Sequence, residues 1–120
     1  MRTKPWRRQK YNAKPTEYRG WRFDSKAEAD YARGLDARKD AGEIIFWLRQ
    51  IPVDLTEDDR YRLDFLVVES SGELYGVDVK GMETKSFKRV VRLWQRYAPF
   101  PLHVVYRDRV AIIPDETQGE

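Results

Sequence analysis

YRLDFLVVESSGELYGVDVK, residues 61–80, has the pattern of a β-hairpin built from two apolar strands. The first strand, predicted over residues 61–69, is almost continuously apolar, which is typical of a strand in the middle of a sheet. Residues 70–72 supply serine and glycine for a short turn. The second strand is predicted over residues 73–80, so we expect the two strands to pair directly.

Asp64 interrupts the apolar run of the first strand, and Asp78 and Lys80 lie near the end of the second. Side chains alternate between the faces of a strand, so Asp78 and Lys80 point to the same side, with Cα atoms about 6–7 Å apart. Pairing through the short turn would place Asp64 beside them. Because a carboxylate on an apolar sheet is costly unless something compensates it, we expect this cluster to be a functional site.

The composition restricts the chemistry of such a site. The chain has 120 residues, enough for one domain with one core, and it contains no cysteine and a single histidine, His103. Disulfides, thiol nucleophiles and thiolate metal ligands are therefore excluded, and sites built on several histidines are disfavoured. A bound metal ion would be held by oxygen atoms, which favours Mg²⁺ or Mn²⁺.

The sequence also predicts a cytoplasmic protein. It has no run of about 18 apolar residues that could cross a membrane. Its charged N-terminal stretch lacks the apolar segment of a signal peptide. The absence of cysteine suits a reducing compartment.

Positive charge is concentrated in two blocks. Residues 1–22 carry eight lysines and arginines against one glutamate, and residues 80–109 carry eight against two acidic residues. Cations on both sides of a carboxylate cluster indicate a polyanion bound next to the acids, although solvated surface is the alternative. The predicted DNA-binding residues are Arg7, Arg8, Lys10 and Lys14 in a basic arm, and Lys85, Lys88, Arg89, Arg92 and Arg96 on one helix face.

The remaining segments predict an α+β fold in a single domain. Arg19-Gly20 indicates a tight hairpin turn, and Ser25 with Glu28 forms a capping box for a helix that stops at Gly42. Further elements are a strand over residues 43–48 that is limited by Pro52, with residues 53–55 as its possible continuation, a helix over 84–97, and strands over 102–106 and 110–113. We expect a mixed sheet flanked by helices, with a basic arm at 1–14 and a loose tail at 114–120.

Glu28, Asp64, Asp78 and Lys80 are the residue types that metal-dependent phosphodiester hydrolysis needs. Carboxylates hold a divalent cation, which polarises the phosphoryl oxygen and lowers the pKa of a bound water. A neighbouring lysine can be the base, position the water or stabilise charge on the phosphate. These roles of Lys80 stay open, and Glu28 is either a metal ligand or only the cap partner of Ser25.

Asp64, followed fourteen residues later by Asp78-Val79-Lys80, resembles the signature of the PD-(D/E)XK nucleases. The predicted order of helix, three strands, helix and strand is similar to the core of that superfamily. Leu63 stands where the signature usually has proline. The chain also resembles small phage proteins of the superfamily over roughly residues 10–105, in the segments KYNAK (10–14), FDSKAEA (23–29), YRLDF (61–65) and VDVKG (77–81).

The resemblance implies a restriction-endonuclease-like core and a Mg²⁺-dependent DNA endonuclease, with Mn²⁺ as a substitute. It implies metal binding by Asp64, Asp78, the Val79 carbonyl and Glu28, with Lys80 as a catalytic residue. The superfamily includes the archaeal-type Holliday junction resolvases, which are small, basic and dimeric. We therefore expect a phage-encoded homodimer that acts on branched or junction DNA during recombination or replication, in the host cytoplasm.

Other functions remain open. An exonuclease or a general nickase would use the same residues, and a nuclease-like domain that only binds nucleic acid would keep the basic surfaces. The set of Asp64, Asp78 and Lys80 argues against binding alone, which does not need it. Glu17 is a weaker candidate ligand than Glu28. The resemblance to the phage family leaves open that Gln50 contacts the site, although a surface position is expected for it. His103 is expected to have no catalytic role.

Overall fold

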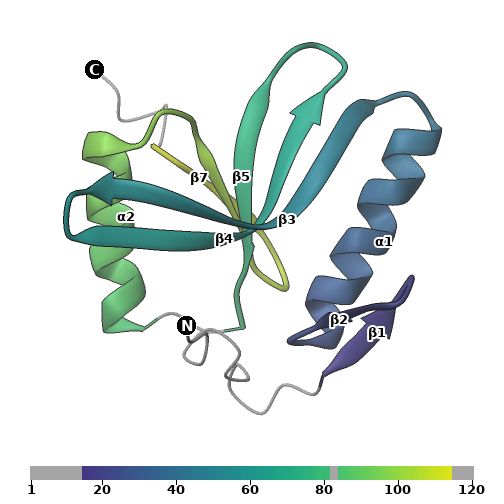
Figure 1. The fold of residues 1–120 in the computed structure, drawn as a ribbon, viewed down its shortest axis with the longest axis horizontal. Helices are drawn as coiled ribbons and strands as arrows, with labels where there is room; N and C mark the ends of the chain where they lie inside the picture. Colours follow the sequence, from purple (N-terminus) through teal and green to yellow (C-terminus); the bar gives the residue numbers. More distant parts are fainter. Residues whose placement is uncertain (1–14, 82–83, 115–120) are drawn as a thin grey trace.

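The computed structural model describes residues 15–81 and 84–114. The sequence predictions for Arg7, Arg8, Lys10, Lys14 and the tail from residue 115 lie outside these residues. The elements are β1 (Thr16–Tyr18), β2 (Trp21–Phe23), α1 (Lys26–Asp40), β3 (Ile44–Thr56), β4 (Asp59–Glu69), β5 (Leu74–Val79), α2 (Lys85–Tyr97), β6 (Leu102–Val105) and β7 (Val110–Ile113), shown in Figure 1.

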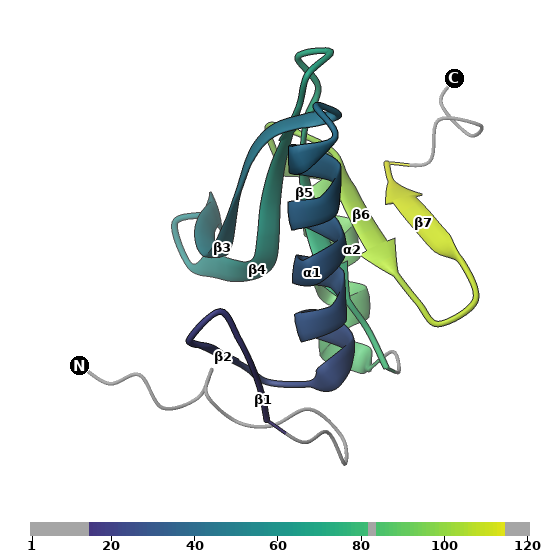
Figure 2. The same cartoon turned by 90° about the vertical axis from the view of Figure 1, so that its right-hand side faces the viewer.

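Five strands form one mixed sheet in the order β3-β4-β5-β6-β7. The neighbours are antiparallel except for β5 and β6, which are parallel and are joined through α2, since a parallel pair requires a crossover connection. Figure 2 shows α1 in front of β5 and α2 behind it. The predicted mixed sheet flanked by helices is therefore confirmed, and β4 lies inside the sheet, as its apolar sequence indicated.

Local signals in the sequence explain where the helices and the small hairpin begin and end. The two-residue turn between β1 and β2 has positive φ at Arg19 and Gly20, as a type I′ turn requires. Ser25 Oγ accepts a hydrogen bond from the Glu28 N–H at 3.1 Å, which caps α1. Gly42 follows α1 with φ +81, a left-handed conformation that glycine adopts without strain. No helix in the described ranges is long and apolar enough to cross a membrane.

The sheet separates two groups of buried apolar side chains, one under each helix. Burying a valine, leucine, isoleucine or phenylalanine side chain stabilises a fold by about 1.5–3 kcal/mol. The α1 cluster consists of Phe23, Ala29, Ala32, Leu35, Ile44, Phe65, Val67, Tyr75, Val77 and Val79. The α2 cluster consists of Leu55, Leu63, Phe87, Trp94, Leu102 and Val104.

β3 is longer than the sequence suggested. It continues through Pro52 to Thr56, so the prediction that Pro52 limits the strand is wrong. β3 is the outermost strand at one edge of the described sheet, and proline is tolerated on an edge because its nitrogen can face away from the neighbouring strand.

The β3–β4 ribbon bends at Gln50 and Asp64. Leu63 packs in the α2 cluster and Phe65 in the α1 cluster, although residues two apart on a flat strand share a face. The register of the flanking pairs puts Gln50, with φ +54, opposite Asp64. In Figure 1 both strands run from beside α1 to a tip that lies over α2. Asp64 therefore lies where the sheet changes direction.

Candidate active site

Asp64 and Asp78 meet where β4 and β5 separate. The last residue pair of the ladder at this end is Phe65–Val77. Beyond it, Asp78 Oδ1 accepts a hydrogen bond from the Asp64 N–H at 3.0 Å, and Asp64 Oδ2 accepts one from the Val79 N–H at 2.8 Å. Each carboxylate thus bonds the backbone of the opposite strand, and the two side chains replace backbone bonds of the ladder.

A tyrosine that the sequence analysis did not single out connects Lys80 to this pair. Lys80 Nζ donates to the Tyr61 hydroxyl at 3.2 Å, and that hydroxyl donates to Asp78 Oδ2 at 2.5 Å. Lys80 Nζ also lies 4.2 Å from the centre of the Phe87 ring. We call Tyr61, Asp64, Asp78 and Lys80 the Asp78 network. Tyr61 precedes Asp64 by three residues in the segment YRLDF, where it resembles any strand tyrosine.

Burial and excess negative charge dominate the electrostatics of this network. Asp78 is 1% exposed, and burial together with the nearby Asp64 carboxylate raises its pKa, against the opposing effects of Lys80 and the Tyr61 hydrogen bond. The pKa of Tyr61 is also raised, first by burial and then by the charge of Asp78. Tyr61 therefore keeps its proton and remains a hydrogen-bond donor.

Glu28 faces inward from the first turn of α1. It is 2% exposed, and its charge contributes to the raised pKa of Tyr61, after burial and the charges of Asp78 and Asp64. The capping bond uses the backbone N–H of Glu28 and not its side chain. The capping pattern predicted the position of Glu28 in the first turn of α1. It did not predict that this side chain would be buried, because a cap partner can equally be exposed.

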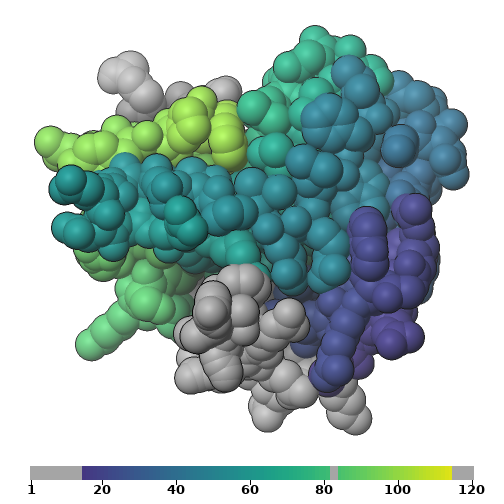
Figure 3. Space-filling view, in the orientation of Figure 1, coloured from purple at the N-terminus to yellow at the C-terminus, as the bar shows by residue number. Residues whose placement is uncertain are grey.

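The predicted cations of α2 all lie at the surface. Lys85, Lys88, Arg89, Arg92 and Arg96 are exposed. Arg89 is already engaged, because its Nη1 lies 2.6 Å from Asp59 Oδ1 at the start of β4. In Figure 3, the green α2 segment projects at the lower left.

The other candidates occupy different positions. Glu17 is exposed on β1. Gln50 is partly buried at the bend, contrary to the expected surface position, and its Oε1 accepts a hydrogen bond from Arg62 at 3.4 Å. His103 stacks on Tyr75 with ring centres 3.8 Å apart, and burial lowers its pKa.

The oxygen donors of the Asp78 network fit a Mg²⁺ or Mn²⁺ ion that keeps part of its water shell. Within residues 15–81 and 84–114, no three or more His, Cys, Asp or Glu side chains are arranged to hold a metal ion by themselves. Mg²⁺, however, usually keeps several waters and needs one or two carboxylates. Asp64 and Asp78 provide two, and a buried carboxylate with a raised pKa gains from a nearby cation.

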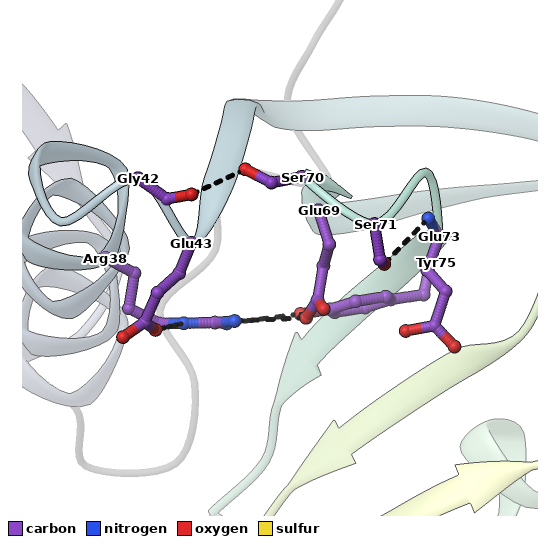
Figure 4. A network of polar contacts seen from close by, with 8 residues as sticks. All are labelled: Arg38, Gly42, Glu43, Glu69, Ser70, Ser71, Glu73 and Tyr75. Carbon is purple, nitrogen blue, oxygen red and sulfur yellow. Dashed lines mark hydrogen bonds and ion pairs between the residues drawn. The ribbon is translucent and has the colours of Figure 1, made fainter.

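A second polar network lies at the other end of β4 and β5 (Figure 4). Glu69 Oε2 accepts a hydrogen bond from the Tyr75 hydroxyl at 2.8 Å and forms an ion pair with Arg38 at 3.1 Å. Arg38 also pairs with Glu43 at 2.9 Å and donates to the Tyr75 hydroxyl at 3.4 Å. The hydrogen bonds that Glu69 accepts from Tyr75 and Arg38 lower its pKa. We call Arg38, Glu43, Glu69 and Tyr75 the Glu69 network.

Comparison with known proteins identifies a family. A family model described as "Protein of unknown function (DUF1064)" matches residues 8–109. The chain belongs to this family. The DUF1064 region includes Glu28, the whole Asp78 network and α2. No curated protein and no solved structure matches the chain.

Proposed function

We propose that this chain is a divalent-metal-dependent DNA endonuclease. The proposal is carried by the buried Asp78 and the half-buried Asp64 at the open end of the β4–β5 ladder, with Lys80 linked to Asp78 through Tyr61. Two neighbouring carboxylates in an apolar setting are unfavourable for folding. The cost of placing these two charges side by side supports a chemical role for them.

The roles of the residues follow from their chemistry. Asp64, Asp78 and the Val79 carbonyl would bind the metal ion directly, and Glu28 would complete the shell around it. When bound, this ion polarises a phosphoryl oxygen and activates water. The ammonium group of Lys80 has only donors, so it can orient a water molecule or stabilise negative charge on the phosphate.

DNA would lie across α2. Lys85, Lys88, Arg92 and Arg96 are exposed and are spaced to follow phosphates, whereas Asp59 competes with DNA for Arg89. Arg7, Arg8, Lys10 and Lys14 would add contacts from the N-terminal arm. Phosphate contacts of this kind set the position of the duplex without reading its sequence.

The substrate we propose is branched DNA, most simply a four-way junction. The similarity of the Asp64 and Asp78-Val79-Lys80 motifs to those of Holliday junction resolvases supports it. A symmetric homodimer would present two sites to the equivalent strands of a junction. A phage-encoded enzyme of recombination or replication, working in the host cytoplasm, fits this activity.

A cleavage assay tests the proposal. The protein is incubated with a labelled four-way junction, a nicked duplex, a linear duplex and a single strand, each with Mg²⁺, Mn²⁺ or EDTA. We expect internal cuts near the branch point in both metals and none in EDTA. Stepwise products from the ends would indicate an exonuclease instead, and gel shifts without cleavage in all three conditions would indicate a binding module.

A further inference from the structure

Tyr61 lies between the two kinds of charge in the Asp78 network. Its ring packs against Phe87, with ring centres 6.4 Å apart, at the edge of the α2 cluster. Its hydroxyl is the atom that bonds both Lys80 Nζ and Asp78 Oδ2. The side chain therefore does more than fill space under α2.

The direction of these two hydrogen bonds is fixed by chemistry. A lysine ammonium can only donate, so the Tyr61 oxygen must accept from Lys80. The hydroxyl proton is then available for Asp78 Oδ2, and the short distance of 2.5 Å suits a bond from a hydroxyl to a carboxylate. The result is a directed chain from Lys80 through Tyr61 to Asp78.

Lys80 has a second restraint. Its Nζ lies 4.2 Å from the centre of the Phe87 ring, a distance suited to a cation–π contact. A free lysine side chain samples many rotamers, and it loses that freedom when its ammonium group is held in place. The hydroxyl and the ring together restrict Lys80 before any substrate arrives.

We propose that Tyr61 is a positioning residue: its hydroxyl fixes the ammonium of Lys80 relative to the Asp78 carboxylate and so sets where the lysine meets the reacting phosphate. This inference rests on the proposed nuclease function. It assigns Tyr61 no contact with the substrate, because its effect passes through Lys80. Such preorganisation is worth up to about 100-fold in rate when it prevents a displacement of about 1 Å.

Tyr61→Phe removes the hydroxyl and keeps the ring that packs under α2. The chain offers a matched control in Tyr75→Phe, because the Tyr75 hydroxyl also lies between a carboxylate, Glu69, and a cation, Arg38. We expect Tyr61→Phe to lower kcat about 10- to 100-fold on a cleaved junction with little change in KM. Tyr75→Phe should keep the kcat of the wild type.

A double-mutant cycle separates positioning from a general structural effect. If Tyr61 acts through Lys80, Tyr61→Phe should cost nothing further in a Lys80→Ala background. An equal loss in both backgrounds would overturn the inference, as would an unchanged kcat in the single variant.

An NMR measurement tests the inference even if no DNA is cleaved. The ¹⁵Nζ–H signal of Lys80 should be visible and slow to exchange with solvent in the wild type and in Tyr75→Phe, because the ammonium is hydrogen-bonded. It should broaden or vanish in Tyr61→Phe. If it is unchanged there, Tyr61 does not hold Lys80, whatever the protein cleaves. If it behaves as expected in a protein that cleaves no DNA, the positioning stands and the nuclease function fails.

Discussion

Each end of the β4–β5 hairpin carries a cation, a tyrosine hydroxyl and a carboxylate, but the three groups are connected differently at the two ends. At one end Arg38, Tyr75 and Glu69 join α1 to the hairpin, and at the other Lys80, Tyr61 and Asp78 form a chain under α2. In the Glu69 network the cation reaches the carboxylate directly, and the pKa of Glu69 is lowered. In the Asp78 network the cation reaches Asp78 only through the phenol, and the pKa of Asp78 is raised.

This difference separates a structural polar network from a candidate chemical site. In the Glu69 network, which is partly exposed, Arg38 pairs directly with both Glu43 and Glu69, so the network serves the fold as it stands. In the Asp78 network, Asp78 is buried and a second carboxylate, that of the half-buried Asp64, lies next to it. The single lysine of this network reaches Asp78 only through the Tyr61 hydroxyl. A further cation would relieve the repulsion between the two carboxylates, which is the behaviour expected of a metal site.

The largest expected effect comes from removing one carboxylate at each end. Asp78→Ala should lower metal-dependent cleavage by at least about 10³-fold, because it removes a proposed metal ligand. DNA binding should survive, since the cations of α2 are untouched. Glu69→Ala is the control and should cleave at a rate near that of the wild type. Gel-based cleavage rates together with binding by fluorescence anisotropy provide the comparison, and normal cleavage by Asp78→Ala would refute the site.

A smaller effect is expected from Glu28, the carboxylate that α1 brings to the Asp78 end. Glu28→Gln preserves a residue that can cap α1, so the melting temperature should change little. We expect cleavage to fall about 10- to 100-fold, as is usual when a group that supports a metal is replaced. Glu43→Gln, next to Arg38, is the control. Full activity in Glu28→Gln would make Glu28 a cap partner only.

DNA binding should also distinguish the two ends. Lys88 and Arg92 are exposed on α2, whose Phe87 contacts Lys80. Replacing both by alanine should weaken binding to every DNA shape and flatten the slope of log K against log salt by roughly two units, at about 0.9 per phosphate contact. The control is Arg33→Ala with Lys39→Ala on the exposed face of α1. An equal change in both variants would show that binding depends on net charge and not on α2.

The smallest expected effect is on stability, with opposite signs at the two ends. The pKa of Asp78 is raised by folding, so the folded state binds more protons and this group costs stability as pH rises above its unfolded value. Without metal, Asp78→Asn should therefore stabilise the protein at pH 8, on the order of 1–2 kcal/mol, and this gain should disappear in acid.

Glu69 should show the reverse. Its folded pKa is lowered, so its contribution is present above the unfolded pKa and is lost as pH falls through the folded one. Glu69→Gln should destabilise the protein at pH 8, by less than about 1 kcal/mol because the ion pair is partly exposed, and should have no effect in acid. Urea unfolding at several pH values measures both variants. The same sign for both would mean that the Asp78 network is compensated.

What the sequence predicted correctly is mostly local. The hairpin of residues 61–80, the cap at Ser25 and the stop at Gly42 depend on neighbours in the chain, and the short turn is enough to bring Asp64 beside Asp78. The alternation of side chains along a strand predicts that residues two apart stay on the same face from end to end. The bend at Gln50 was therefore not predicted.

The features that were missed depend on packing between distant segments. Tyr61 reaches Asp78 because β4 changes sides at the bend and carries its first residues under α2. The burial of Glu28 depends on how α1 docks on the sheet, which the capping pattern does not specify. The Glu69 network joins α1 to the hairpin across more than thirty residues, and no sequence pattern marks Arg38 as its partner.

The short connection between β4 and β5 has a consequence for the order of folding. Asp64 and Asp78 are fourteen residues apart, whereas Glu28 and the strand β6 must be brought in from much farther along the chain. Local contacts form with less loss of loop entropy, so the hairpin and its pair of acids should assemble before either helix docks. The repulsion between the two acids is then already present in the transition state for folding. A divalent cation that binds between them would speed refolding as well as slow unfolding, and would link the folding rate of this protein to the free metal concentration around it.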